Sequence, residues 1–289
     1  MSSHAGGKGR LTGDSLGHLA GALKKQWKRY RKELKRCQNK FSEKAIHDSR
    51  VETRRLLAIV ELLCGFLPAG RVKKIECALK EHLDSFDDLR DIQVQLQPAG
   101  KMRRKFAAAR RFHDYLVKRE ERFARRTRKR IKKVKTGPLD KLIQECLKKV
   151  EKQWKVCGRE QANGRLWRTM DRAFVRAKQL RAQIDPRDTQ TIHCTRVAFK
   201  RFRYMVEALA DCIPSANEQR LEAMHDYQTL MGDIQDAQVL LTAVDKYLCK
   251  HQNEPKSALR FRKELLRRRQ VLIRRYLGAA DELLQFWPG

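Results

Sequence analysis

The sequence predicts an all-α protein assembled from two copies of one helical unit. Only fifteen Gly and seven Pro occur in 289 residues, and they cluster at breaks between long segments. Apolar residues in those segments recur at the period of a helix rather than with the alternation of a strand. Three sequence blocks also occur twice in the same order, at offsets of 140, 146 and 145 residues. We therefore expect two helical bundles, each built around one apolar stripe per helix.

The first unit is expected to span residues 15–136. Its apolar periodicity is interrupted at Pro68–Gly70 and Pro98–Gly100, and it ends before Gly137 and Pro138. Residues 1–14 are polar and Gly-rich, without the apolar core of a signal peptide, so we expect them to be disordered. The predicted helices of this unit are 15–38, 43–67, 70–97 and 100–135.

The second unit is expected to span residues 138–286. Breaks are expected from Gly158 to Gly164, at Asp185–Pro186 and at Pro214. Proline and glycine disfavour helix interiors, which is why these positions set the boundaries. The predicted helices of this unit are 138–157, 164–183, 189–212, 216–250 and 255–286.

The most specific repeat pairs a histidine with arginines. IHDSRVETRR at 46–55 and IHCTRVAFKR at 192–201 share Ile, His, Arg, Val and Arg in register. A flanking block precedes each copy and another follows it, so the chain repeats a whole unit rather than one short motif. The flanking pairs are 26–36 with 166–176 and 87–94 with 232–239.

The charge indicates a polyanionic partner. Sixty-six Lys and Arg residues against thirty-four Asp and Glu leave a formal net charge of +32. Such a surplus attracts polyanions over long range, so nucleic acid, an anionic membrane surface and inorganic polyphosphate are all candidates. Membrane insertion is not expected, because the best apolar run, 56–68, is short and contains Glu61. The eight Cys form no CxxC motif, so we expect reduced thiols in a cytoplasmic protein.

Each histidine motif places cations on one side of a helix. With the residues of 46–55 on a helical wheel, His47, Arg50 and Arg54 lie together, opposite the apolar side. The first-turn N–H groups add to the attraction for anions. The second copy has the same arrangement with His193, Arg196 and Lys200, and Arg203 widens its basic side.

The helix before each motif carries a second basic ridge, which could line a common groove with the first or simply face solvent. Side chains one turn apart would present a positive charge every ~5–6 Å, which suits a chain of phosphates without bases. Sequence-specific readout and base stacking would require protruding amides and exposed aromatics, and neither stands out. The ridges are Lys25, Lys28, Lys32 and Arg36 in the first unit, and Arg165, Arg168, Arg172 and Arg176 in the second.

The motifs resemble those of the CHAD family (conserved histidine α-helical domain). HDSRVETRR and HCTRVAFKRFRYMVE resemble its two HxxRVxx(R/K)R phrases, and FDDLRDIQV and MGDIQDAQV resemble its second signature. The resemblance covers about 15–286, so both units together would form one CHAD domain. It implies two pseudo-symmetric four-helix bundles, with long antiparallel helices around a basic central cavity or pore. It also implies non-enzymatic binding of inorganic polyphosphate, often at polyphosphate granules.

The resemblance also implies which side chains contact the ligand. The two copies depart from each other at two positions: Leu57 stands where the second copy has Arg203, and Gln235 stands where the first has Arg90. The halves are therefore expected to contribute unequally. The ligand contacts implied by the motif are His47, Arg50, Arg54, Arg55, His193, Arg196, Lys200, Arg201 and Arg203.

Three other interpretations stay open. The chain could bind nucleic acid, with some non-specific affinity expected in any case. It could be a phosphohydrolase or phosphotransferase that uses His47 or His193, although no P-loop or metal cluster is present. It could also recruit proteins to granules, which is compatible with polyphosphate binding. The basic run 101–135 is a candidate second polyanion surface, and no cofactor or metal is expected. The Asp88–Asp91 and Asp233–Asp236 pairs are expected to orient groove arginines.

Overall fold

The computed structural model describes residues 11–251 and 255–288, and these form an α-helical protein in which no strand occurs. Of the segment expected to be disordered, residues 1–10 lie outside the described residues. Residues 11–14 are folded: Leu11 is buried, and the Thr12 N–H donates to the Cys212 carbonyl at 2.9 Å. The helices are α1 Ser15–Asn39, α2 Glu43–Leu62, α3 Ala69–Asp84, α4 Asp87–Met102, α5 Ala107–Lys132, α6 Gly137–Val156, α7 Arg159–Ala182, α8 Thr189–Ala208, α9 Glu218–Lys250 and α10 Pro255–Ala279.

Three short 3-10 helices follow α2, α8 and α10. They are η1 Leu63–Gly65, η2 Ala210–Cys212 and η3 Ala280–Gln285. Helix α7 begins at Arg159, so the expected loop from Gly158 to Gly164 is largely helical.

The chain between residues 69 and 106 has two breaks where one was expected. Pro98 lies inside α4, so the break expected at 98–100 falls later, between Met102 and Ala107, and an additional break falls between Asp84 and Asp87. Ala99 and Met102 are buried, so packing favours continuing the helix although the proline ring removes one backbone hydrogen bond. At the additional break the Ser85 hydroxyl donates to the Glu81 carbonyl at 2.8 Å. The turn leaves the Leu83 carbonyl available to a side chain from α2.

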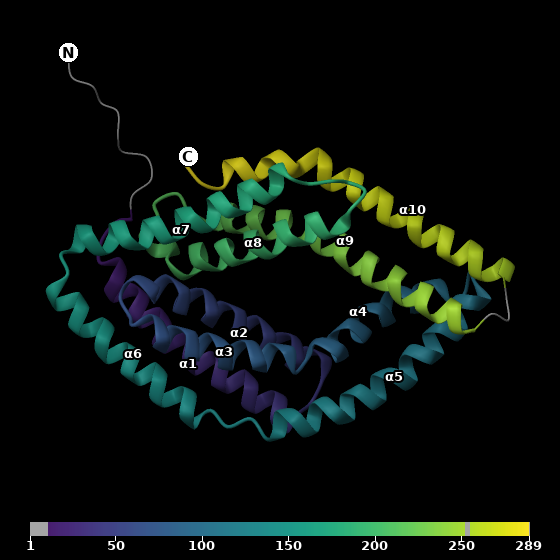
Figure 1. Cartoon of the computed structure of the whole chain (residues 1–289), viewed down its shortest axis with the longest axis horizontal. Coiled ribbons are helices and arrows are strands. Elements are labelled where there is room, and N and C mark those ends of the chain that lie inside the picture. Colours follow the sequence, from purple (N-terminus) through teal and green to yellow (C-terminus); the bar gives the residue numbers. More distant parts are fainter. Residues whose placement is uncertain (1–10, 252–254, 289) are drawn as a thin grey trace, which may run out of the picture.

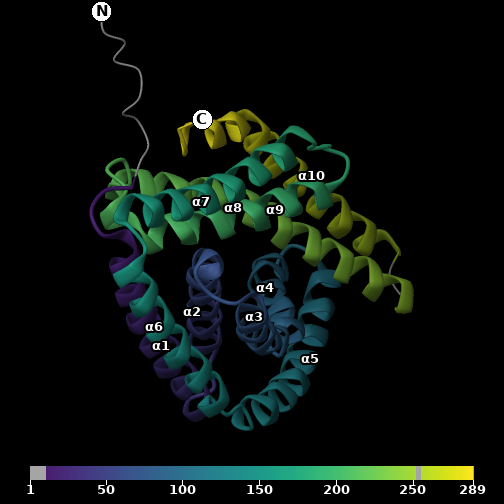
Figure 2. The ribbon, with the colours of Figure 1, turned by 60° about the vertical axis from the view of Figure 1, so that its left-hand side comes forward.

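The helices form two layers. Figure 1 shows α7, α8, α9 and α10 above α1, α2 and α3, with α4 and α5 leading away towards the far ends of α9 and α10. Helix α6, which the sequence assigned to the second unit, packs against α1 and α3 of the first. Figure 2 shows α6 running beside α1. It therefore connects the two units along the outside of the first.

Two hydrophobic clusters hold the layers together, and each contains residues of both units. The larger one joins α1, α2, α3 and α6 to α7, α8 and α9. The smaller one lies where α4 and α5 meet α9 and α10, with Phe112 and Phe261 fully buried and their ring centroids 6.3 Å apart. Because the cores are shared, the two units are expected to unfold together rather than as separate domains.

The two helices that carry the histidine motifs are positioned by their caps and by each other. The Ser42 hydroxyl accepts from the Ala45 N–H at the start of α2, and the Asp188 carboxylate accepts from the Gln190 N–H at the start of α8. Such caps satisfy N–H groups that would otherwise lack a partner. Helices α2 and α8 then pack directly against one another, which brings the two motif copies together.

Candidate anion-binding site

A cavity of about 380 Å³ lies between α2, α3 and α8. Its lining contains five Lys or Arg side chains and two Glu side chains, so positive charge is in excess. His193 and Tyr204 complete the polar part of the wall. The cationic side chains are Arg54, Lys80, Arg196, Lys200 and Arg201, and the acidic ones are Glu61 and Glu76.

Three of these cations have no counterion. Among the described residues, Arg54, Arg196 and Lys200 form no ion pair and no hydrogen bond, and the Nε of Arg196 is buried without a partner. The two glutamates are occupied elsewhere, because Glu61 pairs with Arg201, and Glu76 with Lys80 at 3.7 Å. Half-buried charges without partners are unfavourable, so these three side chains are the groups that an anion would stabilise most.

The pKa values of the cavity cations reflect this crowding. Burial, followed by the positive charges of Arg54 and Arg196, lowers the pKa of Lys200 to about 6. Burial and the neighbouring Arg50 charge lower the pKa of Arg54 to about 10. Desolvation and like charges both disfavour the charged form of a base, and a bound anion would reverse the second effect.

The two motif histidines occupy different positions. His193 lines the cavity, and its Nδ1 is buried without a hydrogen-bond partner among the described residues. His47 is exposed and is not part of the lining. Partial desolvation of its ring, followed by the Arg90 charge, lowers the pKa of His47; the Asp48 charge opposes this change, and Lys200 and Arg54 add smaller lowering contributions. His47 therefore lies within electrostatic reach of the cavity cations, beside the cavity rather than in its wall.

Arg50 and Arg196 occupy equivalent motif positions but have different surroundings. Arg50 is only 7% exposed, and its Nη1 donates to the Asp87 carboxylate at 2.7 Å and to the Leu83 carbonyl at 2.9 Å. Both acceptors lie at the break between α3 and α4. Arg196 instead lines the cavity, where burial lowers its pKa and the Asp236 charge opposes that change. Arg50 thus fastens α2 to the α3–α4 turn, whereas Arg196 remains available to a ligand.

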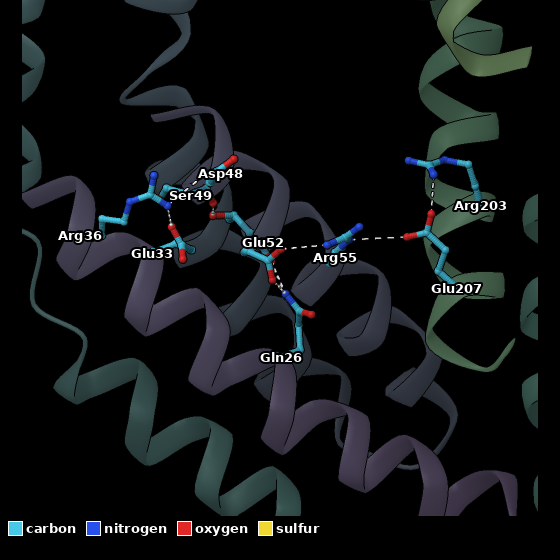
Figure 3. Close-up of polar contacts among 10 residues, drawn as sticks. Gln26, Glu33, Arg36, Asp48, Ser49, Glu52, Arg55, Arg203 and Glu207 are labelled. Carbon is cyan, nitrogen blue, oxygen red and sulfur yellow. Dashed lines mark hydrogen bonds and ion pairs between the residues drawn. The ribbon is translucent and has the colours of Figure 1, made fainter. Parts of the chain in front are cut away.

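Arg55 and Arg203 belong to a polar network beside the cavity, outside its lining. Figure 3 shows Arg203, Glu207, Arg55 and Glu52 in contact one after another, from α8 to α2, and Gln26 of α1 ends the series. Arg55 lies 3.5 Å from Glu207 and 2.9 Å from Glu52. Arg203 is 6% exposed, and it also bonds Gln228 at 3.0 Å. Both guanidinium groups are occupied by protein carboxylates.

The ion pairs between α2 and α8 are reciprocal. Arg201 of α8 pairs with Glu61 of α2, and Arg55 of α2 pairs with Glu207 of α8. Arg55 and Arg201 lie 146 residues apart, as do Glu61 and Glu207, and this is also the offset of the histidine motifs. Each copy of the motif therefore supplies an arginine to the carboxylate of the other, which fixes the separation of the two helices.

The flanking ridges do not join the cavity, whose lining includes none of these eight described residues. Arg36 pairs with Glu33 and Asp48, and Arg165 donates to the Gly65 carbonyl at 3.4 Å. The remaining six are exposed on the outer faces of α1 and α7: Lys25, Lys28, Lys32, Arg168, Arg172 and Arg176.

Several residues of the site were missed by the sequence reasoning, among them Ala58, Glu61 and Val197 of the cavity wall. Lys80 and Glu76 reach the cavity from α3, which carries no repeated motif, so no periodic signal marks them. Leu57, where the second copy has an arginine, lines the cavity. Asp87 is the partner of Arg50, although the adjacent Asp88–Asp91 pair was expected to orient the arginines. Asp233 and Asp236 act on Arg196 through their charge.

Two other kinds of functional feature are absent from the described residues. They contain no group of three or more His, Cys, Asp or Glu side chains that could hold a metal ion. No helix within 11–251 or 255–288 is long and apolar enough to cross a bilayer.

Comparison with known proteins identifies the sequence family. A family model described as the CHAD domain matches residues 21–245, which is well over half of the chain. No curated protein gave a match.

Two solved structures are similar in fold. The crystal structure of the CHAD domain from the plant Ricinus communis matches with a TM-score of 0.69 and 16% identity, covering 96% of this chain and 98% of that one. PptA from Streptomyces chartreusis matches with a TM-score of 0.66 and 14% identity, covering 94% and 100%. At such identities the likeness concerns the fold.

Proposed function

The chain belongs to the CHAD domain family, and from that premise we propose that it binds inorganic polyphosphate in the cavity between α2, α3 and α8. The observation that carries the proposal is the set of unpaired cations Arg54, Arg196 and Lys200. They come from both copies of the histidine motif and converge on one cavity. Successive phosphates of one polyphosphate chain would place a negative charge beside each of these cations.

The chemistry of the lining favours phosphate over nucleobases. A guanidinium can donate to two phosphate oxygens at once, and an ammonium acts as a point charge. Tyr204 is the aromatic residue of the lining, and it is buried, so it offers no exposed face to a base. The imidazole of His193 also lines the cavity.

We propose binding without hydrolysis. General-base or metal-assisted hydrolysis needs a carboxylate or another group free to activate water. Both acidic side chains of the cavity are paired with cations, so neither is free to activate water. The test is phosphate release from long-chain polyphosphate with Mg²⁺. Turnover that disappears in a His193→Ala variant would establish an enzyme instead.

Binding is tested directly with Arg54→Gln combined with Lys200→Gln. Each lost charge-assisted hydrogen bond is worth about 1.5–3 kcal/mol, so the double variant should bind polyphosphate at least ~100-fold more weakly. The matched control is Lys118→Gln with Arg122→Gln, which removes two charges from exposed positions on α5. Equal losses in the two variants would mean that overall charge, not the cavity, determines affinity.

Nucleic acid is the second candidate, because the net charge of +32 and the exposed cations of α5 attract any polyanion. Competition at equal phosphate concentration distinguishes the two. Polyphosphate should displace DNA more effectively than DNA displaces polyphosphate, and equal potency would favour a nucleic-acid binder.

In cells, the proposal places the protein at polyphosphate granules, where it could also recruit other proteins. A fluorescently tagged chain should concentrate at granules and become diffuse in cells that cannot synthesise polyphosphate. The Arg54→Gln/Lys200→Gln variant should stay diffuse in both.

A further inference from the structure

Two adjoining hollows lie on the outside of the molecule, between α6 and the turn that joins α2 to α3. Their volumes are about 610 and 420 Å³, and they share Lys149 and Lys152. Together we call them the α6 groove. Its cationic side chains are Arg71, Lys148, Lys149, Lys152, Lys155 and Arg165.

The lysines of the α6 groove have no counterions. Among the described residues, Lys148, Lys149, Lys152 and Lys155 form no ion pair or hydrogen bond. The acidic side chains of the groove are already engaged: Glu145 pairs with Arg71 at 3.0 Å, and Glu151 with Lys24 at 3.0 Å. Lysines three and four residues apart on one helix repel each other. A polyanion lying in the groove would remove this repulsion.

Helix α3 borders both the central cavity and the α6 groove. Lys80 lies in the wall of the cavity and Arg71 in the wall of the groove, and Lys73 and Lys74 are exposed between them along the helix. Arg165 reaches the groove from α7 and donates to the Gly65 carbonyl of the α2–α3 turn at 3.4 Å. Cationic side chains thus lead along α3 from the cavity to the groove.

We infer that the α6 groove is an extension site, which binds the part of a long polyphosphate chain that projects from the central cavity. This inference rests on the proposed function and adds a preference for long chains over short ones. The groove suits a chain without bases, because the one aromatic residue in its lining, Phe66, is buried. It also gives α6 a role, since this connecting helix lies outside the repeated motifs.

The test compares tripolyphosphate, which is short enough for the cavity alone, with long-chain polyphosphate. The variant is Lys149→Gln with Lys152→Gln. The control, Lys129→Gln with Lys132→Gln, removes two exposed lysine charges at the same spacing of three residues on α5. Affinity for each ligand is measured over a series of salt concentrations.

For long-chain polyphosphate, the α6 variant should lower the slope of log affinity against log salt by about two, one for each lysine. Its affinity for tripolyphosphate and the slopes of the control variant should not change. An unchanged slope for the long chain would overturn the inference, as would an equal fall in the control variant or an equal loss of duplex DNA binding. If the unmodified protein binds neither polyphosphate, the proposed function itself fails, which is a distinguishable result.

Discussion

Lys200 lies in the same cavity as Arg54, its counterpart 146 residues earlier in the chain, and among the described residues neither side chain has a carboxylate partner. The Arg54 charge adds to the effect of burial in lowering the pKa of Lys200 to about 6. The repeat therefore brings two like charges together where a protein of purely structural purpose would separate or pair them. Two predictions concern this lysine.

Polyphosphate binding should take up protons. Free Lys200 is largely neutral at pH 7, and a bound phosphate would raise its pKa, so affinity should fall as pH rises above about 6. For a single titrating group, the affinity falls by at most about tenfold per pH unit. Calorimetry at pH 7 in buffers of different ionisation enthalpy measures the uptake. Lys200→Arg should reduce the proton uptake, leaving a smaller uptake by His47 and His193. A binding enthalpy of the wild-type protein that does not depend on the buffer would contradict the prediction.

Lys200→Met should stabilise the free protein. Because the folded-state pKa is lowered, the unfolded chain binds more protons between about pH 6 and the ordinary lysine value, so wild-type stability rises with pH across that window. The variant lacks this dependence. Urea unfolding should give the variant a higher free energy of unfolding than the wild type at pH 7. The difference between the two proteins should be smaller at pH 9. A less stable variant would mean that the charged lysine has a favourable partner.

Arg50 and Arg196 should respond differently to the same substitution. Arg196→Gln should weaken polyphosphate binding about tenfold or more with little change in stability, because it removes an unpaired cavity cation. Arg50→Gln should instead lower the free energy of unfolding by about 1–3 kcal/mol, because the Asp87 and Leu83 acceptors lose their donor. Binding assays and urea unfolding on both variants check the contrast, and a reversed pattern would contradict the assignment.

The carboxylates of the two reciprocal ion pairs, Glu207 and Glu61, should differ in their contribution to stability, because Glu207 also pairs with the buried Arg203. Glu207→Gln leaves the buried Arg203 without its charged partner and should destabilise the protein by about 1–3 kcal/mol. Glu61→Gln breaks the pair with the exposed Arg201 and should change stability by less than about 1 kcal/mol. Thermal unfolding of the two variants at one pH provides the comparison. Equal losses of stability in the two variants would show that the contact with the buried Arg203 adds nothing to the contribution of Glu207.

The fold class and the helix that carries each motif could be predicted from sequence, because both depend on local patterns. The break in the third predicted helix could not. Pro98 gives a strong local signal, yet the burial of Ala99 and Met102 is decided by contacts with α5, α9 and α10. The placement of α6 against α1 and α3 likewise depends on which helix offers a complementary apolar face.

The cavity was only partly predictable for the same reason. Helical periodicity put Arg50 and Arg54 on one side of α2, and Arg196 and Lys200 on one side of α8. It could not show that Asp87 captures Arg50, because that contact requires the chain to turn after Asp84. Nor could it place Lys80 in the wall, since α3 has no repeat partner with the same residue.

A crystal structure of the protein with bound polyphosphate would show directly whether the cavity is the binding site. We expect phosphates within hydrogen-bond distance of Arg54, Arg196 and Lys200, in the cavity between α2, α3 and α8. Phosphates found only along the exposed cations of α5, with the cavity free of phosphate, would contradict it.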